Sequence, residues 1–188
     1  MPRIPLTKGQ FAWIDEVDRP TLLAVGRWCY SAYGYAVHYY IDANDKPKVL
    51  YMHRMVMERM LGTPIPYGLQ VDHISRESEG RLTRVDNRRE NLRLATRSQN
   101  QANKGRQGNN SSAYKGVSAN HGKWEARIKY DGQRLNLGRF EDPALAAMMY
   151  DAASRVLNQE FAGLNFPAQI TPPSLEVEVK NRLGRYGV

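Results

Sequence analysis

The chain has 188 residues, of which 41% are hydrophobic, so it can fill the core of one medium domain or two small ones. No apolar run approaches the ~18 residues of a membrane span, and the start MPRIPLTKGQ lacks the apolar region of a secretory signal. We therefore expect a cytoplasmic protein with no membrane partner. The one cysteine, Cys29, excludes an internal disulfide and a structural zinc site built on paired thiolates.

The basic residues are concentrated in one part of the chain. The net charge is +8, from 27 Lys and Arg against 19 Asp and Glu. The segment 81–139 alone holds fourteen Lys and Arg against four Asp and Glu, interleaved with Asn, Gln, Tyr and Trp. A solvated surface is the simplest explanation of basic charge, but this concentration favours a footprint on a phosphate backbone. We expect a polyanionic partner.

The first fifty residues predict a small antiparallel sheet rich in aromatic side chains. Tyr35, Val37, Tyr39 and Ile41 alternate with other residues, which is typical of a strand with one buried face. A turn over 43–47 leads to a returning strand. Because the aromatic residues share the alternating face, we expect them in the core and not stacked on nucleic acid bases.

Helical spacing begins at Met52 and continues to Met60, and Gly62 followed by Pro64 supplies a C-terminal stop. His53 opens this helix. Beyond it the sequence predicts a short strand over 70–74, a polar loop over 75–85, a second strand around 92–94 and a helix from Thr96 to Asn103.

The segment KGRQGNNSS has no apolar residue, and we interpret it as a linker between two domains. Three strands are predicted behind it, over 114–119, 124–130 and 133–140, with Asp131-Gly132 as a hairpin turn. Asp142-Pro143 starts a helix whose expected apolar face is Leu145, Met149, Ala152 and Val156. The tail holds a possible short helix over 174–183, with an apolar line of Leu175, Val179 and Leu183.

The predicted fold class is α+β, in five segments. They are an N-terminal antiparallel β segment (1–50), a strand-loop-strand-helix core (51–103), a flexible linker (104–112), a small three-stranded sheet packed on one helix (113–168) and the tail (169–188).

One carboxylate, one imidazole and three carboxamides stand at the ends of the core elements. Asp72 and His73 end the first strand, Asn87 and Asn91 precede the second, and Asn100 lies one turn into the helix. Oxygens of Asp72 and Asn100 suit a hard divalent ion such as Mg²⁺ that keeps several waters. His73 is suited to take a proton from a water that attacks a phosphodiester. Taken singly, these residues are explained as turn residues or a hydrogen-bonded core histidine, so the inference depends on their joint order.

The runs YMHRMVMERMLG, VDHI and VDNRRENLRLATRSQN, in this order, resemble the His-Asn-His (HNH) endonucleases of the phage and intron homing type. The resemblance spans 51–103 and implies a ββα-metal fold and a hydrolase that cuts phosphodiester bonds of double-stranded DNA. It implies a divalent metal, Mg²⁺ or else Mn²⁺. The implied roles are metal ligands Asp72 and Asn100, catalytic His73 as general base, catalytic Asn91 orienting its imidazole, Asn87 shaping the loop, and His53 supporting the site.

Two features depart from the usual HNH pattern. The third motif position is Asn100 and not His, which favours Mg²⁺ or Mn²⁺ over zinc. The loop over 75–86 is longer than the usual form. Neither departure removes a catalytic group.

Residues 114–167 closely resemble the Apetala-type DNA-binding domain of plant ethylene-response factors, which also occurs beside homing nucleases. Alternation places Arg127 and Lys129 opposite Ala126 and Ile128, so one sheet face is cationic and can lie in a major groove. The candidate DNA-binding residues, eight from the resemblance and Lys123 from its place beside the strands, are Lys115, Gly116, Ser118, Lys123, Trp124, Arg127, Lys129, Arg134 and Asn136. Ser118 and Asn136 replace an Arg and a Trp of the plant pattern, so the plant target sequence does not carry over.

The leading hypothesis is a metal-dependent DNA endonuclease whose second domain holds the target. The resemblance implies a homing role in a mobile element of a phage or bacterium, in the host cytoplasm, as a monomer or homodimer. The alternative is a sequence-specific DNA-binding regulator with a non-catalytic nuclease fold, against which the complete set of candidate site residues argues. An RNA-binding protein fits the charge, but the aromatic sheet signature of RNA modules is missing after the linker.

Overall fold

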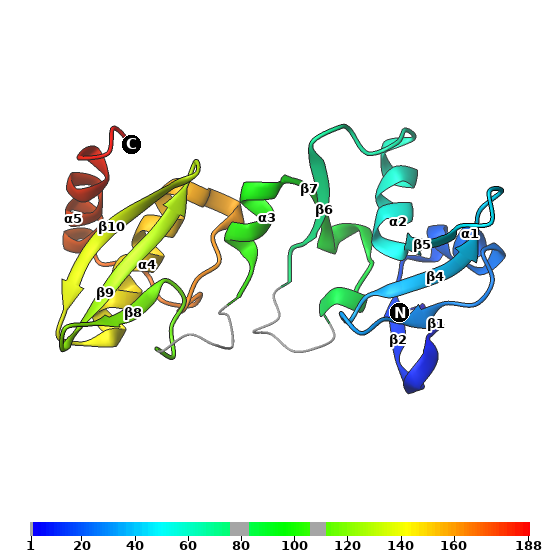
Figure 1. Cartoon of the computed structure of the whole chain (residues 1–188), viewed down its shortest axis with the longest axis horizontal. Helices are drawn as coiled ribbons and strands as arrows, with labels where there is room; N and C mark the ends of the chain where they lie inside the picture. Colours follow the sequence, from blue (N-terminus) through cyan, green and yellow to red (C-terminus); the bar gives the residue numbers. More distant parts are fainter. Residues whose placement is uncertain (1, 76–82, 106–111) are drawn as a thin grey trace. The chain divides into compact units, whose positions relative to one another are not determined.

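The computed structural model describes residues 2–75, 83–105 and 112–188 (Figure 1). The chain divides into two compact units, Met1–Arg97 and Ser98–Val188, which both combine helices with antiparallel sheets. The division falls at the first residue of α3 (Arg97–Asn103) and not within the linker expected at 104–112, most of which lies outside the described residues. Within the described ranges, no helix is long and apolar enough to cross a membrane.

The first unit has one core that includes its N-terminal segment. Its elements are β1 (Arg3–Pro5), β2 (Phe11–Trp13), α1 (Arg19–Ala24), β3 (Cys29–Tyr30), β4 (Ala36–Ile41), β5 (Pro47–Tyr51), α2 (Met52–Leu61), β6 (Leu69–His73) and β7 (Leu92–Thr96). The strands pair as β1-β2, β3-β4-β5 and β6-β7. Buried Trp28 from the N-terminal segment belongs to the same cluster as Met52 of α2 and Val71 of β6. The N-terminal segment is therefore packed into the unit that carries the strand-loop-strand core, and it contains a helix, α1, that strand alternation did not predict.

Helix α2 forms where its spacing predicts it. Met52 and Val56 are fully buried on one face, and the helix ends at Gly62, whose φ of 68° lies in the left-handed region that a residue with a Cβ adopts only with strain. The predicted helix and its C-terminal stop are confirmed.

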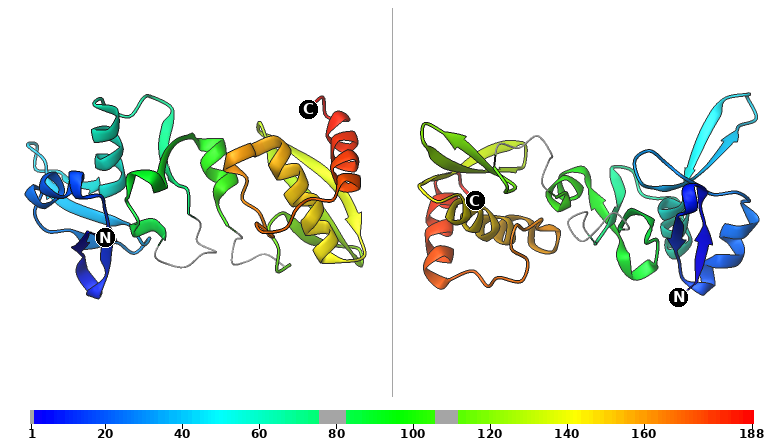
Figure 2. Two further views of the ribbon diagram at one scale, coloured as in Figure 1. Left: turned by 180° about the vertical axis from the view of Figure 1, so that it is seen from behind. Right: turned by 90° about the horizontal axis from the view of Figure 1, so that it is seen from below.

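The expected burial of the aromatic face of β4 is wrong. Val37 is 1% exposed, but Tyr39 and Ile41 are 57% and 61% exposed. The reason is that β4 and β5 run on as a two-stranded hairpin that projects from the rest of the first unit (Figure 2, right), whereas β3 pairs only with Ala36 and Val37. The side chains of Tyr39 and Ile41 therefore have no layer to pack against.

The second unit is a three-stranded sheet packed on two helices. After α3, its elements are β8 (Val117–Asn120), β9 (Lys123–Tyr130), β10 (Gln133–Phe140), α4 (Pro143–Asn158) and α5 (Pro173–Gly184), in the strand order β10-β9-β8. Asp131 and Gly132 both have positive φ and join β9 to β10 as the predicted two-residue turn. The three predicted strands and the predicted start of the helix at Asp142-Pro143 are confirmed.

Half of the expected apolar face of α4 is buried. Met149 and Ala152 are buried as predicted, but Leu145 and Val156 are 41% and 43% exposed, and Ala146 and Ala153 are fully buried instead. Small alanines let the helix approach the sheet closely, and this decides which face is covered.

The tail completes the second core. Leu175, Val179 and Leu183 of α5 are buried against α4 and β10, as their spacing predicts.

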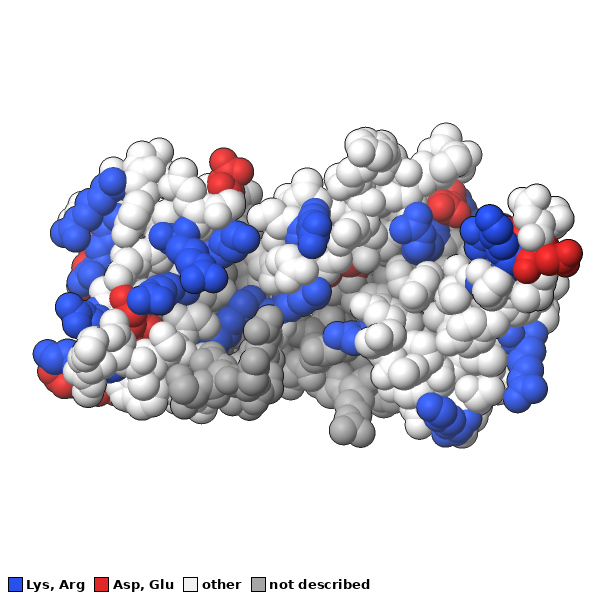
Figure 3. Space-filling model, in the orientation of Figure 1, with Lys and Arg blue, Asp and Glu red and all other residues white. Residues whose placement is uncertain are grey.

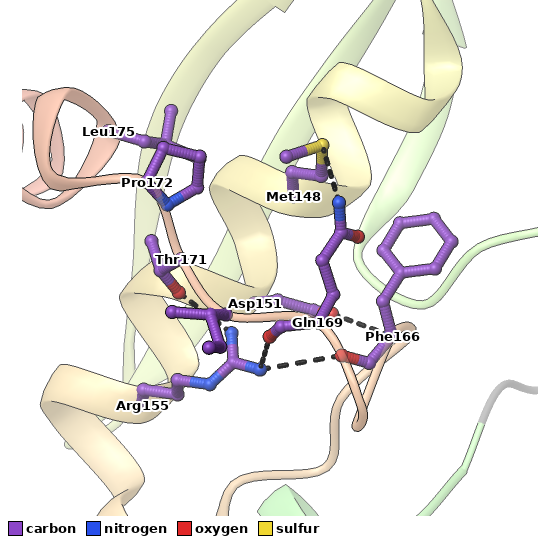
Figure 4. Close-up of a pocket in the computed structure, with 9 residues that line it drawn as sticks. Met148, Asp151, Arg155, Phe166, Gln169, Thr171, Pro172 and Leu175 are labelled. Atoms are coloured by element: carbon purple, nitrogen blue, oxygen red, sulfur yellow. Dashed lines mark hydrogen bonds between the residues drawn. The ribbon is translucent and has the colours of Figure 1, made fainter.

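The segment before α5 is hydrogen-bonded to two side chains of α4 around a small pocket (Figure 4). Asp151 accepts the backbone N–H of Phe166 at 2.7 Å, and Arg155 donates to Thr171 Oγ1 at 2.9 Å. Burial raises the pKa of Asp151.

Candidate functional site

The β6-β7 hairpin carries the acidic and imidazole groups of the candidate site. In its antiparallel register Asp72 faces Arg93 and His73 faces Leu92. Asp72 is 5% exposed, and Arg93 Nε donates to its Oδ2 at 3.0 Å. This charged hydrogen bond fixes the carboxylate at the end of β6.

His73 is buried, and its surroundings favour the neutral form of its imidazole. Burial lowers its pKa to about 4, Asn87 and Asp86 act in the opposite direction, and Arg84 adds to the lowering. A neutral imidazole has one nitrogen lone pair that can accept a proton. Asn87, which was expected to shape the loop, thus acts directly on His73.

His53, at the start of α2, forms a close pair with His73. The two ring centroids lie 5.1 Å apart in an edge arrangement. Burial, His73 and Arg54 lower the pKa of His53 to about 3, and its Nδ1 has no hydrogen-bond partner among the described residues. The structure therefore places His53 beside the candidate base, as expected of a supporting residue.

Two tyrosines, Tyr35 before β4 and Tyr51 at the end of β5, lie beside this histidine pair. The Tyr35 ring lies 5.2 Å from His53 and 6.1 Å from His73, and Tyr51 lies 5.4 Å from His53. Arg84 covers Tyr35 at 5.1 Å from the ring centroid. Sequence reasoning assigned Tyr35 only to a buried strand face, because contacts between distant segments leave no mark on local periodicity.

Asn91 closes the loop between the two strands. Its Oδ1 accepts the backbone N–H of Ser75 at 2.9 Å and the Ser75 hydroxyl at 2.7 Å, and its Nδ2 donates to Asp86 O at 2.8 Å. These contacts hold the two ends of the loop together. Asn87 also contacts this loop, since its Nδ2 donates to Val85 O at 3.0 Å. The stretch between Ser75 and Thr83 lies outside the described residues.

The loop over 86–91 is held from outside by the N-terminal segment. Trp13 O accepts the backbone N–H of Asn87 at 2.8 Å, and Asp15 accepts that of Arg89 at 2.7 Å. Asp18, fully buried, accepts from Arg89 Nε at 2.8 Å and from Arg59 Nε at 2.9 Å. Sequence reasoning missed all three of these N-terminal residues.

Asn100 lies in α3, in the second unit, whereas Asp72 and His73 lie in the first. Within the described ranges there is no group of three or more His, Cys, Asp or Glu that could hold a metal ion. A metal bound with Asp72 therefore needs carboxamide oxygens or water as further ligands.

The outer face of the second unit's sheet is cationic, as alternation predicts. Ala126, Ile128, Leu135 and Leu137 are buried, and the exposed side chains on the opposite face include Arg127, Lys129, Arg134 and Asn136. In register, Arg134 faces Lys129 and Asn136 faces Arg127. Figure 3 shows basic side chains gathered on the face of the second unit that carries β8, β9 and β10.

Other candidate DNA-binding residues have different surroundings. Lys115 Nζ donates to Ala102 O at 2.6 Å and lies over the Tyr150 ring. Gly116 has a φ of 73°, and a Cβ there would overlap that ring. Trp124 packs on the apolar core.

The remaining two share the cationic face, because Ser118 pairs with Glu125 and Lys123 is two residues before Glu125 on β9. Ser118 is half-buried on β8 opposite Glu125, and Lys123 Nζ pairs with Glu141 at 2.6 Å. The structure thus brings six of the nine candidates together on one face.

Residues 50–102 match the family model described as HNH endonuclease. This segment includes the β6-β7 hairpin, the histidine pair and Asn100. A protein of Acanthamoeba polyphaga mimivirus, named an uncharacterized HNH endonuclease, is 28% identical over 158 residues, which are 84% of this chain and 76% of the viral protein. The chain therefore carries a segment that matches the HNH endonuclease model.

A second similarity is to a plant protein. An ethylene-responsive transcription factor of Arabidopsis thaliana is 41% identical over 70 residues, which are 36% of this chain and 35% of the factor. The likeness is partial, since the chain spans about a third of the factor's length.

Proposed function

We propose that this protein is a metal-dependent endonuclease that hydrolyses phosphodiester bonds in double-stranded DNA. The observation that carries the proposal is the buried Asp72 and His73 pair at the end of β6, within the segment that matches the HNH endonuclease model. The name of the viral relative supports a nuclease.

In the proposed reaction, His73 accepts the proton of the attacking water. Its neutral form is favoured by burial, and the rings of His53 and Tyr35 hold it in place. Asn91 keeps the loop ends together, and Asn87 acts on the imidazole from the same loop. General-base catalysis needs such a fixed proton acceptor beside the water.

Asp72 and Asn100 are the residues that would hold the metal ion. A carboxylate and a carboxamide oxygen fit a hard cation such as Mg²⁺, and a set without paired thiolates or an imidazole cluster does not favour zinc. When bound, such an ion stabilises the charge that develops on the scissile phosphate and the leaving oxygen. Arg93 orients the Asp72 carboxylate through its hydrogen bond to Oδ2.

The second unit would hold the target through the cationic face of its sheet. Arg127, Lys129 and Arg134 offer charge to phosphates, and Arg and Asn side chains can read base edges in the major groove. The similarity to a transcription factor supports this part of the proposal. Anchoring would raise the local concentration of the nuclease at its site. A homing role in a mobile element, as a monomer or homodimer in a host cytoplasm, extends the proposal by resemblance.

A plasmid-nicking assay tests the activity. We expect supercoiled DNA to be converted to open-circular or linear DNA with Mg²⁺ or Mn²⁺, and not with EDTA. Host genomic DNA serves as a second substrate, because a plasmid can lack the target. If both DNAs are bound but stay intact, the protein is a DNA-binding regulator and the nuclease proposal is wrong.

Replacing Arg134 tests the cationic face. Arg134→Ala should weaken duplex binding by about 1–3 kcal/mol and relax sequence preference if the side chain contacts a base. Arg185→Ala, which removes an exposed arginine after α5, is the matched control and should change affinity little. The wild-type affinity should also fall steeply with salt because counterions are released on binding. Unchanged affinity and preference in Arg134→Ala would remove this face from the binding model.

A further inference from the structure

A buried carboxylate lies within the cationic face of the second unit's sheet. Glu125 alternates with Ala126 on β9, so it belongs to the same face as Arg127 and Lys129. Its side chain is nevertheless only 3% exposed, whereas that of Arg127 is 49% exposed. A carboxylate withdrawn from water at this position needs partners to offset its lost hydration.

Three donors, one from each strand, surround the Glu125 carboxylate. Asn136 of β10 donates through Nδ2 to Oε1 at 2.6 Å, and Asn120 of β8 donates through Nδ2 to Oε2 at 2.9 Å. Arg127 of β9 pairs with Oε2 through Nη2 at 2.5 Å. Glu125 thus connects all three strands on the face that we propose for DNA.

These contacts fix the orientation of two exposed side chains. The carboxamide of Asn136 is bound on both sides, because its Oδ1 also accepts the backbone N–H of Gly138 at 2.8 Å. The Arg127 guanidinium is held at Nη2 by Glu125. Because the Arg127 side chain is about half exposed, the other N–H groups of the guanidinium can point outward. A base edge is recognised by donors and acceptors in a set direction, so such fixation favours discrimination between sequences.

The charge of Glu125 argues against a role in affinity. A negative group on a phosphate-binding face repels the DNA backbone and neutralises part of the Arg127 charge. It weakens binding to every duplex, and therefore its benefit lies in selecting among them.

We propose that Glu125 is the positioning residue for sequence recognition by the second unit, acting through Arg127 and Asn136. The inference rests on the proposed DNA binding by this unit. In this proposed role, Glu125 does not contact DNA. It sets the directions in which the arginine and the asparagine present their hydrogen-bonding groups to a base pair.

The test uses the full chain in EDTA, so that no strand is cut. Duplexes preferred by the wild type are selected from a random library, and dissociation constants are measured for one of them and for a scrambled duplex of equal composition. We expect Glu125→Gln to reduce the ratio of the two constants at least tenfold while binding the scrambled duplex as tightly as the wild type or more tightly. Glu176→Gln, the same change at an exposed position on α5, should keep the wild-type ratio.

A second variant covers the case in which Glu125→Gln lowers the thermal stability. Arg127→Lys keeps the positive charge at a half-exposed position but loses the planar guanidinium that Glu125 orients. It should lower the same ratio, and the double variant should lose no more than the larger single effect. A ratio within twofold of wild type in either folded single variant overturns the inference. A wild type that binds both duplexes equally overturns the proposed sequence-reading function itself.

Discussion

Replacing His73 with alanine should abolish DNA cleavage while DNA binding stays within a few fold of wild type. General-base catalysis contributes about 10²–10⁴-fold to rate, and His73 is the neutral imidazole buried beside Asp72. The groups proposed to anchor the duplex belong to the second unit, so its affinity does not depend on this side chain. Cleavage is measured by plasmid nicking with Mg²⁺, and binding by titration in EDTA.

The matched control is His38→Ala, which makes the same truncation on β4. His38 Nδ1 contacts Arg27 O at 2.8 Å, and the residue takes no part in the candidate site. This variant should cleave at close to the wild-type rate. If His73→Ala lost binding and cleavage to the same extent, or if His38→Ala lost cleavage equally, the general-base assignment would be wrong.

Most secondary structure followed from local patterns. Gly62 ends α2, Asp131-Gly132 turns between β9 and β10, and the Leu175, Val179 and Leu183 line of α5 is buried. Each of these features depends on the conformational preference of a residue or on the spacing of residues that are close in sequence, so it can be predicted from the sequence alone. The apolar and cationic faces of β9 and β10 were predictable for the same reason, because successive side chains of a strand point to opposite faces.

The surroundings of the candidate site were not predictable in this way. The order of Asp72, His73, Asn87 and Asn91 along the chain indicated a site, but the contacts that fix it join distant segments. Asp18 meets Arg59 across 41 positions of sequence and Arg89 across 71. The hydrogen-bond partners of Asn87 and Asn91 in the loop are decided by the packing around them, and alternation carries no information about these partners.

Replacing Asp18 with alanine should destabilise the first unit by about 2–4 kcal/mol. Removing one partner of a buried ion pair costs about 3–5 kcal/mol, and the cost is lower here because the side chains of Arg59 and Arg89 are each 34% exposed and regain some hydration. Glu16→Ala is the matched control, because Glu16 and Asp18 lie in one short 3-10 helix (Glu16–Asp18). Glu16 is 70% exposed and meets Arg19 at 3.4 Å, so its loss should cost less than about 1 kcal/mol.

The stabilising effect of Asp18 should also disappear in acid. Burial alone would raise the pKa of Asp18, but hydrogen bonds and charge from Arg89 and Arg59 outweigh it and lower the pKa below 3.8. A carboxylate with a lowered folded-state pKa stabilises the protein fully above its unfolded pKa of about 3.9, and this contribution is lost as the pH falls through the folded value. The difference in unfolding free energy between wild type and Asp18→Asn should therefore be constant near neutral pH and shrink below about pH 4.

Urea unfolding followed by hydrogen exchange of first-unit peptides measures this difference, since the two units need not unfold together. Two results would show that the ion pairs of Asp18 do not stabilise the first unit. One is a difference in unfolding free energy that does not change with pH, and the other is a loss of stability in Asp18→Ala no larger than in Glu16→Ala.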